Sequence, residues 1–240
     1  MTISRSLFFV ILLTLSGCSD PITRWHQRMT VIVETPDGVR QASSVLGVGL
    51  ERSDGISAEI FKNMAGASYR WHYTGEAVAL DLGEGRWLFA LFADYEPGYI
   101  ALKTLLGEGS KGYSRDAAVS QAVADYVRDV PVEVPTELYP LLVTFEDIND
   151  PASVRSVDPA NLAASFGEGY ALDAITLEIT DALITTGVLE RVLVAWLDMA
   201  EGRDPSIKLN IPPLHLPNDS PRGYINLSKR KFWAADKLSE

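Results

Sequence analysis

Met29-Thr30-Val31-Ile32-Val33-Glu34-Thr35 is followed by Pro36-Asp37-Gly38 and then by small and apolar residues from Val39 to Leu50. The first seven residues are rich in β-branched side chains, which fit the pleated backbone of a strand. Proline, aspartate and glycine in succession are typical of a turn, because proline fixes φ and glycine accepts a positive φ. We therefore predict a β-hairpin over residues 29–50.

A second stretch repeats this pattern. Residues 77–82 and 87–92 are mostly apolar and flank Gly83-Glu84-Gly85-Arg86, whose glycines can adopt the φ values of a tight reversal. The later strand, Trp87-Leu88-Phe89-Ala90-Leu91-Phe92, is apolar on both faces. Such a strand is usually central or covered by helices. We predict that this second hairpin lies in the core.

The hydrophobic period changes after Ser114. The apolar positions of residues 115–128 fall on one stripe, which predicts an amphipathic helix with Ser114 as its N-cap. The stripe consists of Val119, Ala122, Val123, Tyr126 and Val127. Proline cannot donate to a sheet ladder, so the segment 130–135 is predicted to be an extended connector or an edge strand.

Later elements alternate between strand and helix. We predict a buried strand over 140–145, a short helix from Asp158-Pro159 to Phe166, a strand over 174–180 and an apolar helix over 188–200. Five prolines disfavour a long helix over residues 205–222. The predicted fold class is α+β, with antiparallel β-hairpins in the N-terminal half and helices packed from the middle of the chain onward.

The chain begins like an exported protein. Arg5 precedes an apolar run of nine residues, Leu7 to Leu15, which is followed by Ser16-Gly17-Cys18. A positive residue, a short apolar run and small residues in this order are typical of a secretory signal peptide. Leu15-Ser16-Gly17-Cys18 resembles the bacterial lipobox. We therefore predict cleavage after Gly17 and lipid attachment to Cys18.

Two other interpretations of the N-terminus remain. A transmembrane anchor needs about 20 apolar residues, more than this run provides. A signal cut elsewhere would leave Cys18 as an unpaired thiol in an oxidising compartment. We expect a signal peptide over residues 1–17, a lipidated N-terminus and linker over 18–28, and a single domain over 29–240. Because Cys18 is the only cysteine, the core has to hold this domain together without an internal disulfide.

Composition and charge restrict the partners. The chain is 47% hydrophobic and 22% charged, as in an ordinary globular domain. Its net charge is −11, and removal of residues 1–17 takes away one arginine and no acid, which leaves −12. A net acidic surface disfavours nucleic acid. We expect membrane attachment through acyl chains. Ser19 after the cysteine favours the outer over the inner membrane.

One motif suggests a nucleotide. Gly107-Glu108-Gly109-Ser110-Lys111-Gly112 satisfies G-x-G-x-x-G, and Glu133 lies about 20 residues further on. A dinucleotide site requires a helix that begins within the glycine turn, inside a parallel βαβ unit. Here the predicted helix starts only after Ser114, and the preceding hairpins are antiparallel. We expect a loop and no bound cofactor.

Metal and hydrolase motifs are weak. His26, His72 and His215 are scattered and form no zinc pattern. Four residues could supply oxygen ligands to calcium if they converged, although turn formation and helix capping are simpler roles for them. These residues are Asp147, Asn149, Asp150 and Asp158. We expect no metal, and no G-x-S-x-G elbow identifies a catalytic residue.

Near the C-terminus, Lys229-Arg230-Lys231 precedes two aromatic residues, Phe232-Trp233. Cations beside aromatic rings can bind lipid headgroups. We favour the alternative, a solvated tail whose rings pack on the domain.

Two segments resemble a family of uncharacterised proteobacterial envelope proteins, many of them predicted lipoproteins. They are T-V-I-V-E-T-P-D-G at Thr30 to Gly38 and L-L-V-T-F-E-D-I-N-D-P-A-S-V-R-S-V-D-P-A-N-L-A-A-S-F-G-E-G-Y from Leu141 onward. Ile175 to Thr185 belongs to the same match. The resemblance implies a bacterial origin and an envelope location, and it implies no activity, cofactor or site residue.

We therefore expect a lipid-anchored protein that faces the periplasm and binds an envelope protein or a small molecule without catalysis. The alternative is a metal-independent hydrolase that acts on an envelope polymer or ester. A third possibility is a purely structural assembly factor.

Overall fold

The computed structural model describes residues 23–52, 69–92, 96–107, 117–194, 214–215, 224–225 and 232–235. The predicted signal peptide, Cys18, Ser114, and most of the predicted loop at 107–112 and of the proline-rich stretch 205–222 lie outside the described residues. Among the helices that are described, none has the length and hydropathy needed to cross a membrane.

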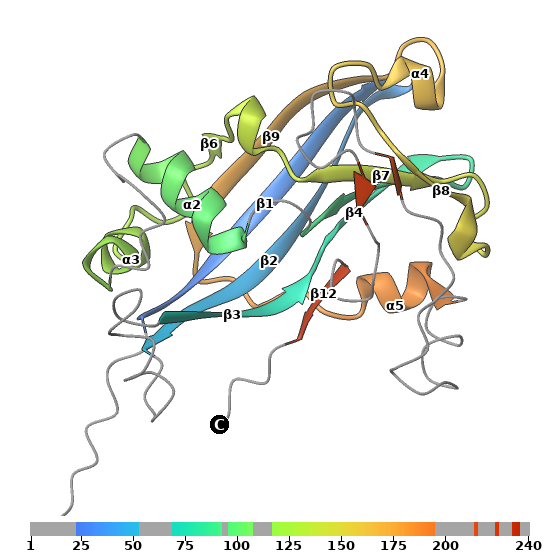
Figure 1. Ribbon diagram of the computed structural model, residues 1–240. Coiled ribbons are helices and arrows are strands. Elements are labelled where there is room, and N and C mark those ends of the chain that lie inside the picture. Colours follow the sequence, from blue (N-terminus) through green and yellow to red (C-terminus); the bar gives the residue numbers. More distant parts are fainter. Residues whose placement is uncertain are drawn as a thin grey trace, which may run out of the picture.

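The larger sheet, sheet A, has six strands in the order β12-β3-β2-β1-β9-β6, and all neighbours are antiparallel. The strands are β1 (Thr23–Thr35), β2 (Gly38–Arg52), β3 (Tyr69–Glu76), β6 (Val132–Glu133), β9 (Ala171–Thr180) and β12 (Trp233–Ala235). Figure 1 shows β1, β2 and β9 running side by side as the long axis of the molecule. Strands β6 and β9 are the predicted edge strand and the predicted strand over 174–180, so both predictions are confirmed.

Strands β1 and β2 form the first predicted hairpin, with Thr35 opposite Gly38. Strand β1 begins at Thr23, so the predicted linker over 18–28 was too long. Trp25 and Gln27 are buried on the inner face of sheet A, where Gln27 accepts a hydrogen bond from Trp25 Nε1 and donates one to the Pro97 carbonyl. Because Gln27 is polar although it points inward, the sequence before Met29 shows no clear alternation of apolar and polar residues. The early start of the strand was therefore not predicted.

The smaller sheet, sheet B, has the order β4-β5-β7-β8. Its strands are β4 (Val78–Gly83), β5 (Arg86–Leu91), β7 (Leu141–Phe145) and β8 (Val154–Ser156). Strands β4 and β5 form the second predicted hairpin, and β5 lies centrally between β4 and β7, as its apolar faces predicted. Only Ala77 separates β3 from β4, so the chain passes directly from sheet A into sheet B.

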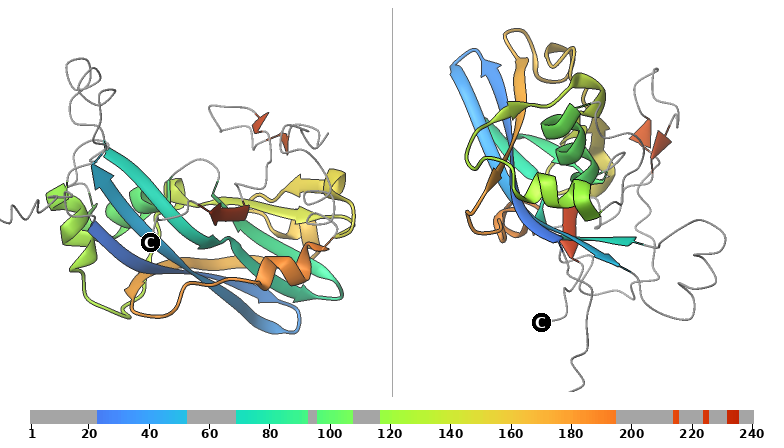
Figure 2. Two further views of the ribbon diagram at one scale, coloured as in Figure 1. Left: turned by 90° about the horizontal axis from the view of Figure 1, so that it is seen from below. Right: turned by 90° about the vertical axis from the view of Figure 1, so that its left-hand side faces the viewer.

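Two hydrophobic clusters hold the layers together. The larger lies between the inner face of sheet A, one face of sheet B and the helices α2 (Pro97–Leu106) and α3 (Ala117–Ala124). The smaller covers the other face of sheet B, where Phe89 and Phe145 contact Phe232 and the helix α5 (Val188–Val192) supplies Leu189. Figure 2 shows α2 and α3 on one side of the long strands. Sheet B is therefore buried on both faces.

Two helices differ from their predicted bounds, and a third was not predicted. Helix α3 ends at Ala124, because Arg128 donates to the carbonyls of Ala124 and Tyr126, and Asp129 N–H bonds the Ile179 carbonyl of β9. Val127 of the predicted stripe is therefore exposed. Helix α2 was not predicted at all.

Helix α4 (Ala163–Phe166) begins later than expected, since Asp158 accepts from Ala160 N–H within a turn and does not cap the helix. Gly167 closes this helix, as predicted, with a φ of 103°. Helix α5 begins at Val188 as predicted, and residues 195–200 of that prediction lie outside the described part.

The fold is thus a mixed α and β fold with antiparallel sheets. Its second half contains β6 to β9 as well as helices, and short 3-10 turns lie at Thr136–Leu138 and Pro151–Ser153. A separate two-stranded pair joins β10 (Leu214–His215) to β11 (Tyr224–Ile225).

Candidate functional site

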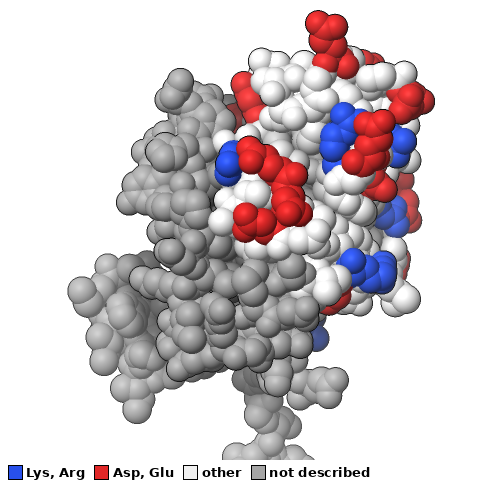
Figure 3. Space-filling view, turned by 90° about the vertical axis from the view of Figure 1, so that its right-hand side faces the viewer, with Lys and Arg blue, Asp and Glu red and all other residues white. Residues whose placement is uncertain are grey.

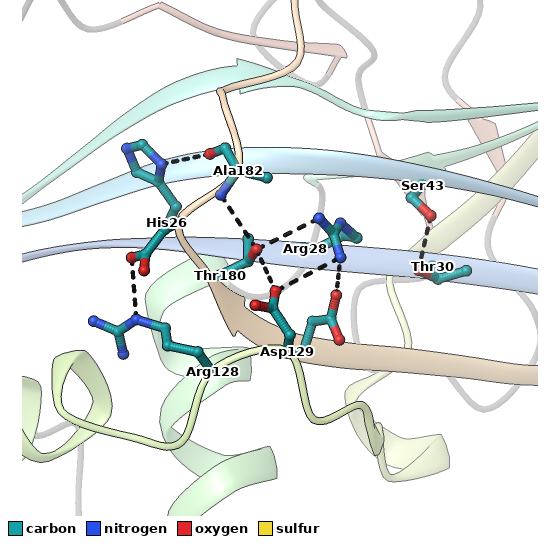
Figure 4. A network of polar contacts seen from close by, with 10 residues as sticks. His26, Arg28, Thr30, Ser43, Arg128, Asp129, Thr180 and Ala182 are labelled. Atoms are coloured by element: carbon teal, nitrogen blue, oxygen red, sulfur yellow. Dashed lines mark hydrogen bonds and ion pairs between the residues drawn. The ribbon is translucent and has the colours of Figure 1, made fainter.

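Four side chains form a polar cluster on the outer face of sheet A, away from the large core. We call Arg28, Asp129, Glu178 and Thr180 the polar joint (Figure 4). Arg28 lies on β1, opposite Glu178 of the neighbouring strand β9, and Asp129 comes from the loop that precedes β6. The polar joint therefore ties that loop to two central strands.

Arg28 is the cation of the polar joint. It donates a hydrogen bond to Glu178 and forms an ion pair with Asp129 at 4.0 Å. The Glu178 side chain is almost fully buried and Arg28 is about two-thirds buried. Because a buried carboxylate is costly unless it is paired, Glu178 depends on this arginine.

Thr180 is fully engaged in the polar joint. Its hydroxyl donates to Asp129 Oδ1 at 2.6 Å and accepts from Arg28 Nη2 at 3.4 Å and from the Ala182 N–H at 3.2 Å. A hydroxyl has one proton and two lone pairs, so these three contacts use all of them. Thr180 is also 97% buried. A hydroxyl in this position holds structure together and is poorly placed to attack a substrate.

From the polar joint the chain crosses the outer face of sheet A. This crossing segment, residues 181–187, passes over β1 and β2 (Figure 4). His26 Nδ1 donates to the Ala182 carbonyl at 2.7 Å, since a carbonyl oxygen can only accept. The Ile184 side chain fills the space over Gly47, where an added Cβ would lie 2.6 Å from Ile184 Cδ1. The crossing segment is thus seated on side chains and on a glycine of the sheet.

The crossing segment ends against the place where β3 leaves sheet A. Thr185 forms two hydrogen bonds with the Val45 backbone of β2, at 2.9 Å each. The buried Glu76 carboxylate then accepts from the N–H groups of Val188 and Leu189 at the start of α5. The segment therefore continues the hydrogen bonding of β2 where β3 has departed.

A second candidate site consists of aromatic residues near the start of β1. The rings of Trp71 and Tyr73 on β3 stack with their centroids 6.3 Å apart and their planes 15° apart. Trp25 packs edge-on against Trp71 at 5.8 Å. The Tyr73 hydroxyl donates to Glu96 Oε2 at 3.2 Å. We call Trp71, Tyr73 and Glu96 the aromatic site.

Helix α2 closes one side of the aromatic site. Gly98, in the first turn of this helix, lies so close to Trp71 that an added Cβ would be 2.8 Å from the ring. Both Trp71 and Tyr73 remain partly exposed. Half-buried aromatic faces beside a carboxylate are a common composition for ligand sites. Sequence reasoning missed this site because its residues lie on β3 and before α2, and neither element was predicted.

The predicted site residues are spread over the fold. His26 lies on β1 and His72 on β3, where His72 Nε2 is 2.8 Å from Glu51 Oε2 of the adjacent strand β2. His215 belongs to β10, which pairs with β11 and with no strand of sheet A or sheet B among the described residues. Within the described residues, no two of these histidines are hydrogen-bonded to each other. His72 and Glu51 form the one histidine and carboxylate pair found within the described ranges.

The four candidate calcium ligands act in turns. Asp147 Oδ1 accepts from Asn149 N–H, Asp150 Oδ1 accepts from Ala152 N–H, and Asp158 has the turn contact described above. These are the simpler roles that we predicted. In the part of the chain that the structure describes, no group of three histidine, cysteine or acidic residues is arranged to hold a metal ion.

The surface around these turns carries both signs of charge. Glu146 Oε1 pairs with Arg155 Nε at 3.2 Å, and both side chains are exposed. Figure 3 shows carboxylates on this side of the molecule with basic groups among them. Exposed pairs of this kind contribute little to stability.

Phe232, the aromatic residue of this segment whose side chain the structure describes, fits the packing alternative. Phe232 is completely buried, in edge-to-face contact with Phe89, and its carbonyl accepts from Ala77 N–H at 2.8 Å. Phe232 therefore belongs to the core, as predicted for the rings of this segment. Lys229, Arg230 and Lys231 lie outside the described residues.

Comparison of the chain with family models, with curated proteins and with solved structures gave no match.

Proposed function

We propose that the chain is a lipid-anchored protein of the bacterial envelope that binds a partner without catalysis. The sequence Leu15-Ser16-Gly17-Cys18 supports the anchor. The position of β1 is compatible with it, because the folded domain begins at Thr23, five residues after Cys18. The domain then faces the periplasm, most simply from the outer membrane, and belongs with the envelope proteins that its sequence resembles.

The aromatic site carries the binding part of the proposal. The Trp71 and Tyr73 rings provide a flat face, and Glu96 provides an acceptor at its edge. This combination fits a ligand with a flat, weakly polar face and a hydrogen-bond donor, such as a sugar ring of an envelope glycan or an aromatic side chain of an envelope protein. The polar joint contributes to stability, since its groups are satisfied by one another.

Binding is tested with the purified, lipidated full-length protein. Envelope glycan fragments and aromatic peptides are screened by thermal shift, and partners are sought by cross-linking in membranes. We expect Trp71→Ala to weaken binding roughly 2- to 10-fold, the equivalent of about 0.5–1.5 kcal/mol for one aromatic contact. Trp87→Ala is the matched control, because Trp87 is also half-buried but stacks on Phe89 in sheet B. Equal effects of both variants, or no ligand and no partner, would contradict the proposal.

The anchor is tested separately. Intact mass of the mature protein should show a chain that begins at Cys18 and carries acyl groups. A Cys18→Ser variant should lose membrane association, because the acyl chains provide the attachment. Equal membrane association of this variant would disprove the lipid anchor.

The hydrolase alternative has one observation in its favour. A carboxylate beside an imidazole, as in Glu51 and His72, can orient a general base. We expect His72→Gln to abolish hydrolysis of an envelope ester if this alternative holds, while His26→Gln, which alters a histidine bonded to a backbone carbonyl, leaves it intact. No hydrolysis by the native protein across envelope polymers and esters would exclude this alternative.

A further inference from the structure

Three large apolar side chains are exposed near one end of sheet A. Leu183 is 89% exposed, Val127 is 55% exposed and Val130 is 45% exposed. Leu183 belongs to the crossing segment, whereas the two valines flank Arg128 and Asp129. Arg128 Nε bonds Asp181 Oδ1 at 3.2 Å, which joins the two segments. We call Leu183, Val127 and Val130 the apolar end.

The apolar end lies beside the start of β1. The carbonyl of Ala182, next to Leu183, is bonded by His26, which is three residues into β1 and thus about 10 Å from its first residue. Cys18 precedes Thr23 by five residues, which span at most about 17 Å. A lipid on Cys18 therefore holds this end of the domain close to the membrane.

The turn end of the β1–β2 hairpin serves as a comparison for the apolar end. Val39 is 66% exposed and lies opposite Glu34 on β1. Glu34 is eight residues beyond His26, roughly 27 Å further along the strand. An exposed valine therefore exists at each end of the sheet, but only the apolar end lies near the lipidation site.

We propose that the apolar end rests on the lipid bilayer, with Leu183, Val127 and Val130 in the zone between headgroups and acyl chains. This inference rests on the proposed lipid anchor. Three side chains would bind a membrane weakly on their own. A short tether turns their contact into an intramolecular one with a high effective concentration, so little binding energy is needed.

The local charge is compatible with this orientation. The chain as a whole is strongly acidic and would be repelled by anionic lipid. Near the apolar end, however, Arg28 lies against Glu178 and Asp129, and Arg128 lies against Asp181. Exposed Arg24 adds a further cation at the start of β1. The three arginines named here thus balance the three acidic residues at this end, so the strong negative charge of the whole chain is not concentrated among them.

The single cysteine makes a direct test possible. When Cys18 is acylated, a cysteine introduced by Leu183→Cys is the only free thiol in the full-length protein. The lipidated variant is placed in phosphatidylcholine vesicles and labelled there with an environment-sensitive fluorophore. Quenching is measured with lipids that carry a nitroxide on the acyl chain. Val127→Cys and Val130→Cys are labelled likewise, with Val39→Cys as the matched control.

We expect at least about three-fold stronger quenching at the apolar end than at residue 39, because side chains in this zone lie roughly 5–10 Å below the headgroup surface. Equal quenching at residues 183 and 39 in an acylated protein would overturn the inference and leave the anchor intact. A shift in label emission that grows with the protein-to-lipid ratio, without quenching by the lipids, would show that the apolar end contacts a second copy of the chain. That result would also overturn the inference of bilayer contact. A protein that leaves the vesicles and shows a labelled Cys18 would disprove the anchor and this orientation together.

Discussion

The Glu76 carboxylate at the end of β3 accepts a hydrogen bond from the Leu189 N–H at 2.9 Å, and the two residues are separated by more than a hundred positions in the chain. A second bond, from Val188 N–H at 2.8 Å, completes the contact. Glu76 is 99% buried. One acidic side chain at the junction of both sheets thus fixes the start of α5 and the end of the crossing segment.

Replacement of the Glu76 carboxylate should destabilise the fold. We expect Glu76→Ala to lower the free energy of unfolding by about 2–4 kcal/mol, because two buried backbone donors lose a charged acceptor. Urea unfolding followed by circular dichroism measures the change. Glu96→Ala, which removes an exposed glutamate, should change stability by less than about 0.5 kcal/mol. Similar values for both variants would show that the cap does not stabilise the fold.

The polar joint allows a comparison between a buried and an exposed ion pair. We expect Glu178→Gln to cost about 1–2 kcal/mol, since this carboxylate is nearly buried against Arg28. Glu84→Gln breaks the exposed pair with Arg86 and should cost less than about 0.5 kcal/mol. The loss at Glu178 should also persist in high salt, because buried pairs are weakly screened. Equal losses of stability in Glu178→Gln and Glu84→Gln that both disappear in high salt would contradict the difference between a buried and an exposed ion pair.

Phe232 tests whether the C-terminal segment is part of the core. We expect Phe232→Ala to cost about 3–5 kcal/mol, because the change leaves a cavity between Phe89 and Phe145. Urea unfolding gives the value, and Val39→Ala at the exposed hairpin end should stay within about 0.5 kcal/mol. A decrease in the free energy of unfolding of less than about 1 kcal/mol in Phe232→Ala would show that the C-terminal segment is not needed for the stability of the core.

The close approach of Gly98 and Trp71 sets two effects against each other. Alanine gains up to about 1 kcal/mol over glycine in a helix, whereas overpacking costs about 1–3 kcal/mol. The gain is smaller in the first turn, so we expect Gly98→Ala to be destabilising and to shift tryptophan emission. In a Trp71→Leu background the clash is relieved, and Gly98→Ala should become neutral or stabilising. The same loss in both backgrounds would rule out the clash.

The elements that could be predicted are those whose signals are local. The β1–β2 and β4–β5 hairpins combine alternating or apolar strands with turn residues, and β7 is a short apolar run between polar ones. Helix α2 was missed because its sequence, Pro97 to Leu106, is apolar on most sides and ends at a glycine-rich stretch. An apolar run of ten residues does not by itself distinguish a helix from a strand.

The candidate sites depend on contacts that the sequence order hides. Arg28 and Glu178 are 150 residues apart, and only the pairing of β1 with β9 places them opposite each other. Trp71 similarly meets Gly98 across two elements that were not predicted. The turn roles of Asp147 and Asp150 were predicted correctly, because an Asx turn is completed within two residues. Asp158 was predicted as a helix N-cap and instead accepts from Ala160 N–H in a turn before the helix.

Tyr139, at the end of a 3-10 turn, links pH to stability. Burial raises the pKa of its phenol, the negative charge of Glu133 raises it further, and a hydrogen bond with the Ile175 backbone acts in the opposite direction. The ordinary tyrosine pKa is about 10. The unfolded chain therefore ionises first, so the stability that the neutral phenol contributes is complete below about pH 10 and is lost as pH rises through the folded pKa. Tyr139→Phe should accordingly show a shallower alkaline loss of stability than the native protein.

The titration of Tyr139 is measured directly as the difference in tyrosinate absorbance between the native protein and Tyr139→Phe. Glu133→Gln should move this titration to lower pH, whereas Glu137→Gln, on the same turn, should leave it unchanged; an unchanged titration in Glu133→Gln would mean that burial alone raises the pKa.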